Sequence, residues 1–256
     1  MRYPVTNSIL GLILAGTAMP AFAQVDNTPL DDDPPEVSSG LSVTANVSLV
    51  SEYRFRGVDL SGGDIAIQGG VDVAHDSGFY VGTWASSIDE TTVGYGHTEL
   101  DVYGGWSGDV AEGVGANIGA IYYLYPNAGS DGEFAYIEFY GSLTGTLGPA
   151  ETTVGVAYAP DQDSLGSTDN LYLYGDVGVG LPGTPVTLSA HLGYTDGFLT
   201  FTDSGNAFDW SVGAELAIAG TPLSLGAAYV GVEGDIPAGA YDFTDDAFVV
   251  SLNASF

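Results

Sequence analysis

Ionisable side chains recur at every second position in several stretches of this 256-residue sequence. Glu52, Arg54 and Arg56 have this spacing, and so do Glu99 and Asp101. Residues two apart on an extended strand point to the same side, so such side chains can gather on one face of a sheet. Carboxylates gathered inside a narrow aqueous passage create a negative potential that attracts cations. The sequence therefore predicts a charged inner surface as its candidate functional site.

The candidate lumen residues share an expected position on the inner face of a closed sheet. They are Glu52, Arg54, Arg56, Asp72, Glu99, Asp101, Tyr103, Glu138, Tyr172, Tyr174, Asp176, His191, Asp209 and Glu215. We expect Arg54 and Arg56 to form a local counter-charge at the mouth of the passage, paired with Asp72 or Glu99. A purely structural role, in which the arginines brace the wall, is an equal alternative.

The sequence contains few residues that could act in catalysis. The histidines are His75, His97 and His191, and only His191, near Ser189, is expected to face inward. Neither a Gly-x-Ser-x-Gly nor a His-x-x-Glu-His pattern occurs. The absence of Cys excludes thiolate nucleophiles and disulfides. We predict no enzyme, no catalytic residue and no cofactor, and keep a membrane-barrel hydrolase as the less favoured alternative.

Clusters of acidic residues invite a metal interpretation, because Ca²⁺ takes oxygen ligands. These clusters are Asp31–Asp33, Asp161 with Asp163, and Asp242 with Asp245 and Asp246. None has the full spacing of an EF-hand loop, so we interpret them as solvated loop charge and predict no metal site. Divalent ions that bridge such loops to anionic lipopolysaccharide would be a non-specific use.

The composition excludes several classes of protein. Asp and Glu total 33 against 3 for Lys and Arg, which gives a net charge of −30. Nucleic-acid binding is excluded, because it needs basic residues to neutralise phosphates. The 38 glycines interrupt every helix-length window past the N-terminus and exclude an all-α fold. The hydrophobic fraction of 45% is too high for disorder in the bulk of the chain.

The N-terminal residues have the features of a secretory signal peptide. Arg2 supplies positive charge, an apolar stretch follows at 9–18, and small residues precede the expected cleavage between Ala23 and Gln24. The stretch is shorter than the ~20 residues that a membrane-spanning helix needs. The predicted organisation is a signal peptide over 1–23, an acidic, Pro-rich flexible lead-in over 24–40, and a barrel over 41–256.

Apolar and polar residues alternate from Leu41 to Phe256. The alternating runs are 41–49, 65–73, 78–88, 99–106, 114–124, 133–145, 152–160, 169–180, 186–194, 208–218, 222–232 and 248–256. Each is close to the ~9–11 residues with which a tilted strand crosses a bilayer. Long connections, such as 54–63, alternate with short ones, such as 181–185. This pattern predicts an all-β, antiparallel transmembrane barrel of about 12 strands, within a range of about 10–14.

The final run carries a signal for membrane assembly. Phe248, Val250, Leu252 and Phe256 lie in phase on one side of it, and the run ends on an aromatic residue. Such an ending resembles the signal that the bacterial barrel-assembly machinery reads. We therefore expect this machinery, together with outer-membrane lipid and lipopolysaccharide, as partners.

Four blocks in the first part of the chain occur in an order that resembles a known family. They are Ser51–Val58 (SEYRFRGV), Gln68–Asp72 (QGGVD), His75–Trp84 (HDSGFYVGTW) and Glu99–Trp106 (ELDVYGGW). They resemble the TorF-type porins (Gcw_chp), over roughly residues 45–106. This chain departs from the family in having Ile65-Ala66-Ile67 where a Pro is common, and in being more acidic. The resemblance implies a porin-like outer-membrane barrel, with no catalytic residue and no established substrate.

These observations predict a porin-like channel in the bacterial outer membrane. It would pass small hydrophilic solutes by passive diffusion and favour cations, because its expected inner surface is acidic. The alternative is a secreted, soluble β-sandwich or adhesin. That alternative leaves the alternation of loop lengths and the terminal Phe256 without an explanation.

Overall fold

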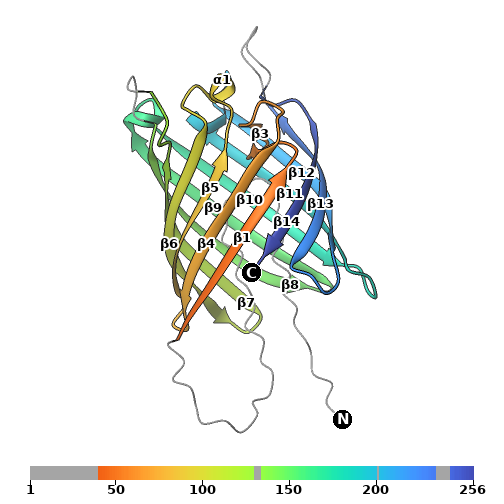
Figure 1. Ribbon diagram of the computed structural model, residues 1–256. Coiled ribbons are helices and arrows are strands. Elements are labelled where there is room, and N and C mark those ends of the chain that lie inside the picture. Colours follow the sequence, from red (N-terminus) through yellow and green to blue (C-terminus); the bar gives the residue numbers. More distant parts are fainter. Residues whose placement is uncertain (1–39, 130–133, 201, 235–242) are drawn as a thin grey trace, which may run out of the picture.

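The alternating runs of the sequence form a ring of long antiparallel strands in the computed structural model, which describes residues 40–129, 134–200, 202–234 and 243–256 (Figure 1). The strands of this ring are β1 (Leu41–Val50), β4 (Ala66–His75), β5 (Phe79–Ser87), β6 (Thr98–Ala111), β7 (Val114–Leu124), β8 (Tyr136–Leu147), β9 (Ala150–Gln162), β10 (Thr168–Gly180), β11 (Val186–Gly197), β12 (Asn206–Ala217), β13 (Leu223–Glu233) and β14 (Ala247–Ser255). Each strand pairs with its neighbour in the chain order, and β1 pairs with β14 to close the barrel. The predicted closed barrel of about twelve strands is confirmed, and the β-sandwich alternative is wrong.

The β1–β14 pairing is shorter than the other contact that β1 makes. It runs from Asn46 opposite Ser255 to Val50 opposite Ser251. On its other side β1 pairs with β4 along its whole length, from Leu41 opposite His75 to Val50 opposite Ala66. The first half of β1 is therefore held mainly by β4.

The outer face of the barrel is apolar. Val43 is 66% exposed, Ile67 64% and Phe248 66%, whereas Ala66, next to Ile67, and Val249, next to Phe248, are buried. Because side chains alternate along a strand, one face of each strand can meet lipid while the other meets the interior. An exposed apolar band of this extent fits a lipid environment better than water.

No helix in the described ranges is long and apolar enough to cross a membrane. The helical elements there are α1 (Glu90–Val93), η1 (Asp163–Leu165) and η2 (Phe198–Thr200), all within connections between strands.

The connections differ between the two ends of the barrel. Tight turns such as 76–78 and 112–113 lie at the end that we call the turn end. Longer segments, such as 51–65 and 88–97, lie at the other end, which we call the loop end. The predicted long connection at 159–169 is shorter in the structure, because β9 and β10 extend past the expected ends and leave only 163–167 between them.

The connection from β1 to β4, residues 51–65, folds into the barrel; we call it the inward loop. It contains a small hairpin of β2 (Arg54–Phe55) and β3 (Val58–Asp59), and residues 53–61 are all buried. The sequence predicts 54–63 as a long connection between strands, but it does not predict that this connection folds into the barrel. Tyr53, Phe55, Val58 and Leu60 are apolar, and they are more stable inside the barrel than in water.

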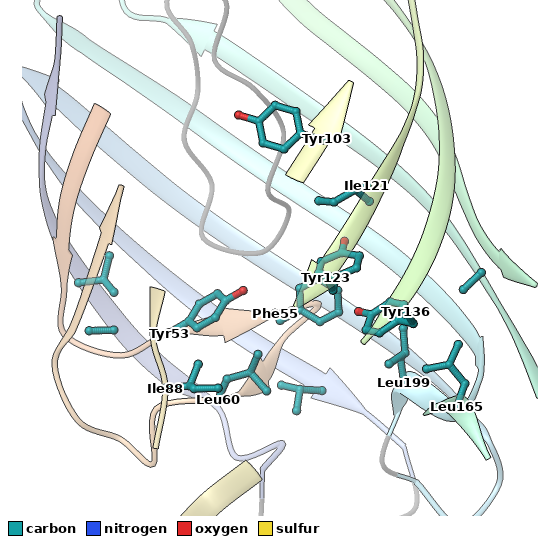
Figure 2. Packing of buried hydrophobic residues seen from close by; sticks show 14 of the residues in the cluster. Tyr53, Phe55, Leu60, Ile88, Tyr103, Ile121, Tyr123, Tyr136, Leu165 and Leu199 are labelled. Atoms are coloured by element: carbon teal, nitrogen blue, oxygen red, sulfur yellow. The ribbon is translucent and has the colours of Figure 1, made fainter. Parts of the chain in front are cut away.

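The inward loop completes the largest hydrophobic cluster of the molecule (Figure 2). Its rings meet those of the wall edge to face: Tyr53 lies 5.6 Å from Trp84, and Phe55 lies 5.9 Å from Tyr123. Leu165 and Leu199, from two other connections at the loop end, join the same cluster. Most of the buried apolar packing of the described chain therefore lies at the loop end, around the inward loop.

Candidate functional site: a lumen constriction

The inward loop contacts several parts of the barrel wall. The Tyr53 hydroxyl donates to Glu99 Oε1 on β6 at 3.2 Å, and Arg56 Nη2 donates to Glu138 Oε1 on β8 at 2.6 Å. At Gly57, an added Cβ would collide with Val232 on β13 and lie 3.0 Å from Cβ of Asp209 on β12. Because β6, β8, β12 and β13 lie on different sides of the ring, the loop crosses the lumen.

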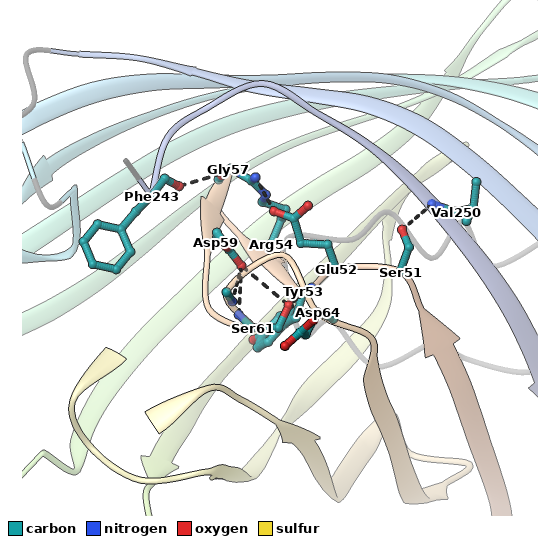
Figure 3. Close-up of polar contacts among 11 residues, drawn as sticks. Ser51, Glu52, Tyr53, Arg54, Gly57, Asp59, Ser61, Asp64, Phe243 and Val250 are labelled. Carbon is teal, nitrogen blue, oxygen red and sulfur yellow. Dashed lines mark hydrogen bonds and ion pairs between the residues drawn. The ribbon is translucent and has the colours of Figure 1, made fainter. Parts of the chain in front are cut away.

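The loop is tied at its base to two other connections, and Figure 3 shows its contact with Phe243 in one of them. The backbone N–H of Asp59 donates to the Phe243 carbonyl at 2.8 Å, and Arg54 Nη1 donates to the same carbonyl at 3.2 Å. The backbone N–H of Asp89 donates to the Leu60 carbonyl at 2.9 Å. These bonds join the loop to the segments that precede β14 and β6, so its position does not depend on its tip alone.

Asp59 and Asp89 stabilise turns at this base. Asp59 Oδ1 accepts from the backbone N–H of Ser61 at 2.8 Å and of Gly62 at 3.0 Å. Asp89 caps α1, where its Oδ2 accepts from the Thr92 hydroxyl at 2.6 Å and the Thr92 N–H at 2.7 Å. These hydrogen bonds from Thr92 hold the pKa of the Asp89 carboxyl below its usual range.

The two arginines form ion pairs within this region. Arg54 pairs with Glu52 of the same loop, and Arg56 pairs with Glu138 of the wall. The predicted partners, Asp72 and Glu99, are therefore wrong. That prediction extended the strand register of β1 beyond Val50, whereas the chain turns inward there and carries both arginines away from β4.

Three carboxylates lie together on the wall beside the loop. Glu99 is 1% exposed, Asp101 0% and Glu138 2%, and Asp101 interacts electrostatically with the other two. Within the described ranges, both carboxylate oxygens of Asp101 and one oxygen each of Glu99 and Glu138 have no hydrogen-bond partner. Arg56 is the cation in contact with this group, and it pairs with Glu138 alone.

A second polar cluster lies on the wall formed by β10, β11 and β12. His191 Nδ1 lies 2.6 Å from Asp176 Oδ1, and His191 Nε2 lies 2.9 Å from Asp209 Oδ1. The Tyr172 hydroxyl donates to Asp209 at 3.1 Å and is within 2.8 Å of His191 Nε2. The rings of Tyr172, Tyr174 and His191 stack beside one another. One imidazole thus joins two carboxylates.

The structure places the remaining predicted residues on the inner face, apart from these two clusters. Asp72 is buried and accepts a hydrogen bond from the Tyr103 hydroxyl at 2.6 Å. Glu215 is partly buried, and its carboxylate interacts with Ser224 across the β12–β13 pair. The predicted lumen residues therefore form at least three separate groups on the wall instead of one ring.

Sequence reasoning missed a tyrosine pair on the inner wall. The hydroxyls of Tyr80 and Tyr140 lie 2.6 Å apart, and Tyr80 donates to Asn117 Oδ1 at 2.6 Å. Glycines on the adjacent strand make room for such rings: a Cβ at Gly105 would lie 2.7 Å from the Tyr80 hydroxyl. The inward phase of Tyr80 and Tyr140 could have revealed this pair, but uncharged side chains gave the sequence analysis little reason to select them.

The geometry gives the hydrolase alternative no serine partner at His191, the histidine of the inner face. His191 contacts Asp176, Asp209 and Tyr172, and in the described part of the chain no hydrogen bond joins it to Ser189. Of the acidic clusters considered for metal, Asp31–Asp33 and Asp242 lie outside the described residues. Within the described ranges, no group of three or more His, Asp or Glu residues has the arrangement of a metal site. The signal peptide and its cleavage site between Ala23 and Gln24 also lie outside the described residues.

A closed antiparallel barrel with an apolar outer face and a loop folded into its lumen defines a porin-type membrane barrel. Residues 35–256 match the family described as "Bacterial protein of unknown function (Gcw_chp)". Because this match covers most of the sequence, the chain belongs to that family. Among curated proteins, no sequence matches the chain.

Solved structures with a similar fold include a porin. The structure of the NanC porin has a TM-score of 0.57 at 8% identity, and the similarity covers 83% of this chain and 99% of that chain. The outer membrane protein OpdK from Pseudomonas aeruginosa has a TM-score of 0.46 at 12% identity, over 86% of this chain and 68% of that chain. At 8% identity, the similarity to NanC shows the fold of a porin.

Proposed function

We propose that the chain is a porin-like outer-membrane channel for the passive diffusion of small hydrophilic solutes, and that it favours cations. The resemblance of the sequence to the TorF-type porins supports this proposal. A barrel of twelve strands lies between eight-stranded barrels, which are packed shut, and sixteen-stranded porins, which enclose an open channel. With the inward loop as its constriction, the passage would be narrow.

The observation that carries the cation preference is the charge balance of the inner wall. Arg54 and Arg56 are the basic residues of the described ranges besides histidine, and both are already paired with carboxylates. Acids that neither the arginines nor His191 contact remain on the inner face: Asp72, Glu99, Asp101 and Glu215. A narrow passage with this excess attracts cations and repels anions.

The membrane orientation and the partners follow from the same proposal. The loop end would face the outside of the cell and the turn end the periplasm, as in other outer-membrane barrels. The exposed side chains of Phe248, Val250 and Leu252 on β14, and of Phe256 just after it, would be read by the barrel-assembly machinery. The outer face would contact lipid and lipopolysaccharide.

The test is electrical. The full chain is inserted into a planar bilayer between two KCl solutions of different concentration, and the reversal potential is measured. We expect a sign that corresponds to K⁺ preference, and a preference that weakens at high salt because charges are screened. A Cl⁻ preference would contradict the cation selectivity, and the absence of any conductance would contradict the channel.

A further inference from the structure

The tip of the inward loop has a backbone conformation that an arginine does not favour. Arg56 has φ 50° and Gly57 has φ 79°, so both central residues of the β2–β3 hairpin are left-handed. This is the pattern of a type I′ turn, in which Asn-Gly is preferred because Asn tolerates positive φ. Strain at a non-glycine residue persists only where the surrounding structure compensates for it. The contacts of the Arg56 side chain are the compensation seen here.

The Arg56 guanidinium makes two kinds of contact, an ion pair with a carboxylate and contacts with aromatic rings. Its Nη2 donates to Glu138 Oε1 at 2.6 Å, and its Cζ lies 4.2 Å from the centre of the Tyr172 ring. The ring of Phe55 lies 4.7 Å from the same carbon. A carboxylate beside aromatic faces binds a planar, delocalised cation by a charged hydrogen bond and by cation–π attraction. Glu138 and Tyr172 belong to the barrel wall, so they do not depend on the loop.

Arg56 does not saturate this site. Glu138 Oε2 and both oxygens of Asp101 are buried and have no hydrogen-bond partner within the described ranges. Nε and Nη1 of Arg56 also have no acceptor there, so the guanidinium is held through one of its nitrogens. Buried carboxylates are unfavourable without partners. The site therefore has acceptor atoms that Arg56 leaves unused and that a better-fitted cation can reach.

We propose that Glu138 and Tyr172 form a binding site for guanidinium-type cationic groups of passing solutes, and that Arg56 occupies this site as an internal ligand. The proposal rests on the channel function and adds a substrate class to it. A solute with such a group exchanges with Arg56, and the strained tip relaxes as Arg56 leaves. A neutral solute of the same shape forms neither the ion pair nor the cation–π contact, and does not exchange.

The experiment uses a variant in which the internal ligand is missing. R56N keeps a residue that accepts positive φ at the tip, and R56G does the same if R56N does not assemble. Binding of methylguanidinium to the purified full-length protein in detergent is measured by calorimetry, with N-methylurea as the neutral isostere. We expect R56N to bind methylguanidinium saturably and about tenfold or more tighter than the wild type. R56N/E138Q is the matched control, in which this binding is expected to be lost.

Calorimetry and conductance separate the two proposals. If R56N conducts K⁺ but shows no saturable binding of methylguanidinium, the site is refuted and the channel stands. Equal binding by R56N and R56N/E138Q, or equal binding of N-methylurea, would also refute the site. If R56N binds methylguanidinium while neither it nor the wild type conducts, the binding site stands and the channel function falls.

Discussion

Two regions of the inner wall pair their buried carboxylates with basic groups in different ways. On β6 and β8, buried carboxylates receive their cation, Arg56, from a loop that crosses the lumen. On β10, β11 and β12, Asp176 and Asp209 share His191, which belongs to the wall itself. In the first region the partners are 82 residues apart in sequence.

The two regions differ in what fixes their contacts: strand register in one, and the position of the inward loop in the other. Asp176 and His191 stand directly opposite each other on paired strands, so their contact follows once the register of β10 and β11 is fixed. The contact between Arg56 and Glu138 exists only because the inward loop enters the barrel. The loop touches the wall cluster through Arg56, which lies over the Tyr172 ring, but it supplies none of the hydrogen bonds among Asp176, His191 and Asp209. These hydrogen bonds should therefore survive changes at the loop, whereas the loop cluster should not. The following experiments test this contrast.

Loss of Glu138 should have the largest effect on stability. Glu138→Ala leaves the Arg56 guanidinium buried without its carboxylate, and breaking a buried ion pair in this way costs about 3–5 kcal/mol. We expect a lower free energy of unfolding, measured by urea titration in lipid vesicles. R56N/E138Q should recover part of the loss, because no unpaired guanidinium remains. An unchanged unfolding free energy for Glu138→Ala would show that the pair is not what fixes the loop.

Removal of the inward loop should have a large effect on transport and little effect on the assembly of the barrel. Replacement of residues 54–63 by a short Gly-Ser linker leaves every ladder of the ring intact, since the backbone of these residues pairs only with itself and with connections. We expect a several-fold higher single-channel conductance in planar bilayers and unchanged heat-modifiable mobility on gels. A linker in place of residues 90–95, which do not cross the lumen, is the control. Equal conductance for the wild type and the loop deletion would mean that the loop does not constrict the passage.

Loss of His191 should have a smaller, local effect. His191→Gln removes an imidazole that lies between Asp176 and Asp209, and leaves these carboxylates with fewer partners. The expected destabilisation is about 1–3 kcal/mol in the same urea titration. Ser189→Ala, on the same strand and face, is the matched control and should be close to neutral. If His191→Gln changed the conductance as much as the loop deletion does, the two regions would not be independent.

The Asp89 cap should give the smallest effect. Asp89→Ala removes the capping hydrogen bonds to Thr92, which are worth about 1 kcal/mol at a helix N-terminus. Because the folded pKa of Asp89 is lowered, its contribution is present above its ordinary pKa of about 3.9 and is lost as the pH falls through the folded value. Faster amide exchange in α1 of the variant at neutral pH, with no difference in strong acid, is the expected result. A difference that persists in strong acid would contradict the capping role.

The fold was largely predictable because its signal is periodic. Each strand of the ring carries the period of two that the sequence shows, and the inward phase of Asp72 and Asp101 follows from it. The inward course of the loop was not predicted, because the alternation of strands identifies 54–63 only as a long connection. Its sequence did contain a signal: Tyr53, Phe55, Val58 and Leu60 are too apolar for an exposed loop, and Arg56-Gly57 separates two short runs as a turn would.

The candidate site was predictable only in part. Strand phase places Glu138 and Asp209 inside, but it cannot state which side chain from elsewhere reaches them. The partner of Glu138 depends on the direction in which the chain leaves β1 after Val50, and this is decided by packing against Tyr123 and Trp84. Contacts between residues distant in sequence carry no local pattern, so they could not be read from spacing.

The short pairing between β1 and β14 has a consequence for how the ring is completed. These strands meet only from Asn46 to Val50, with Ala45 and Phe256 exchanging backbone hydrogen bonds of 3.0 and 2.9 Å just beyond. This seam joins segments that are about two hundred residues apart, so its loop-closure entropy is the largest of any ladder in the ring. We expect the β1–β14 pairing to form last during membrane insertion. In the finished barrel, its amide protons should exchange faster than those of the other strand pairs. A seam of this kind is also where an incomplete barrel would expose free strand edges to a neighbouring chain.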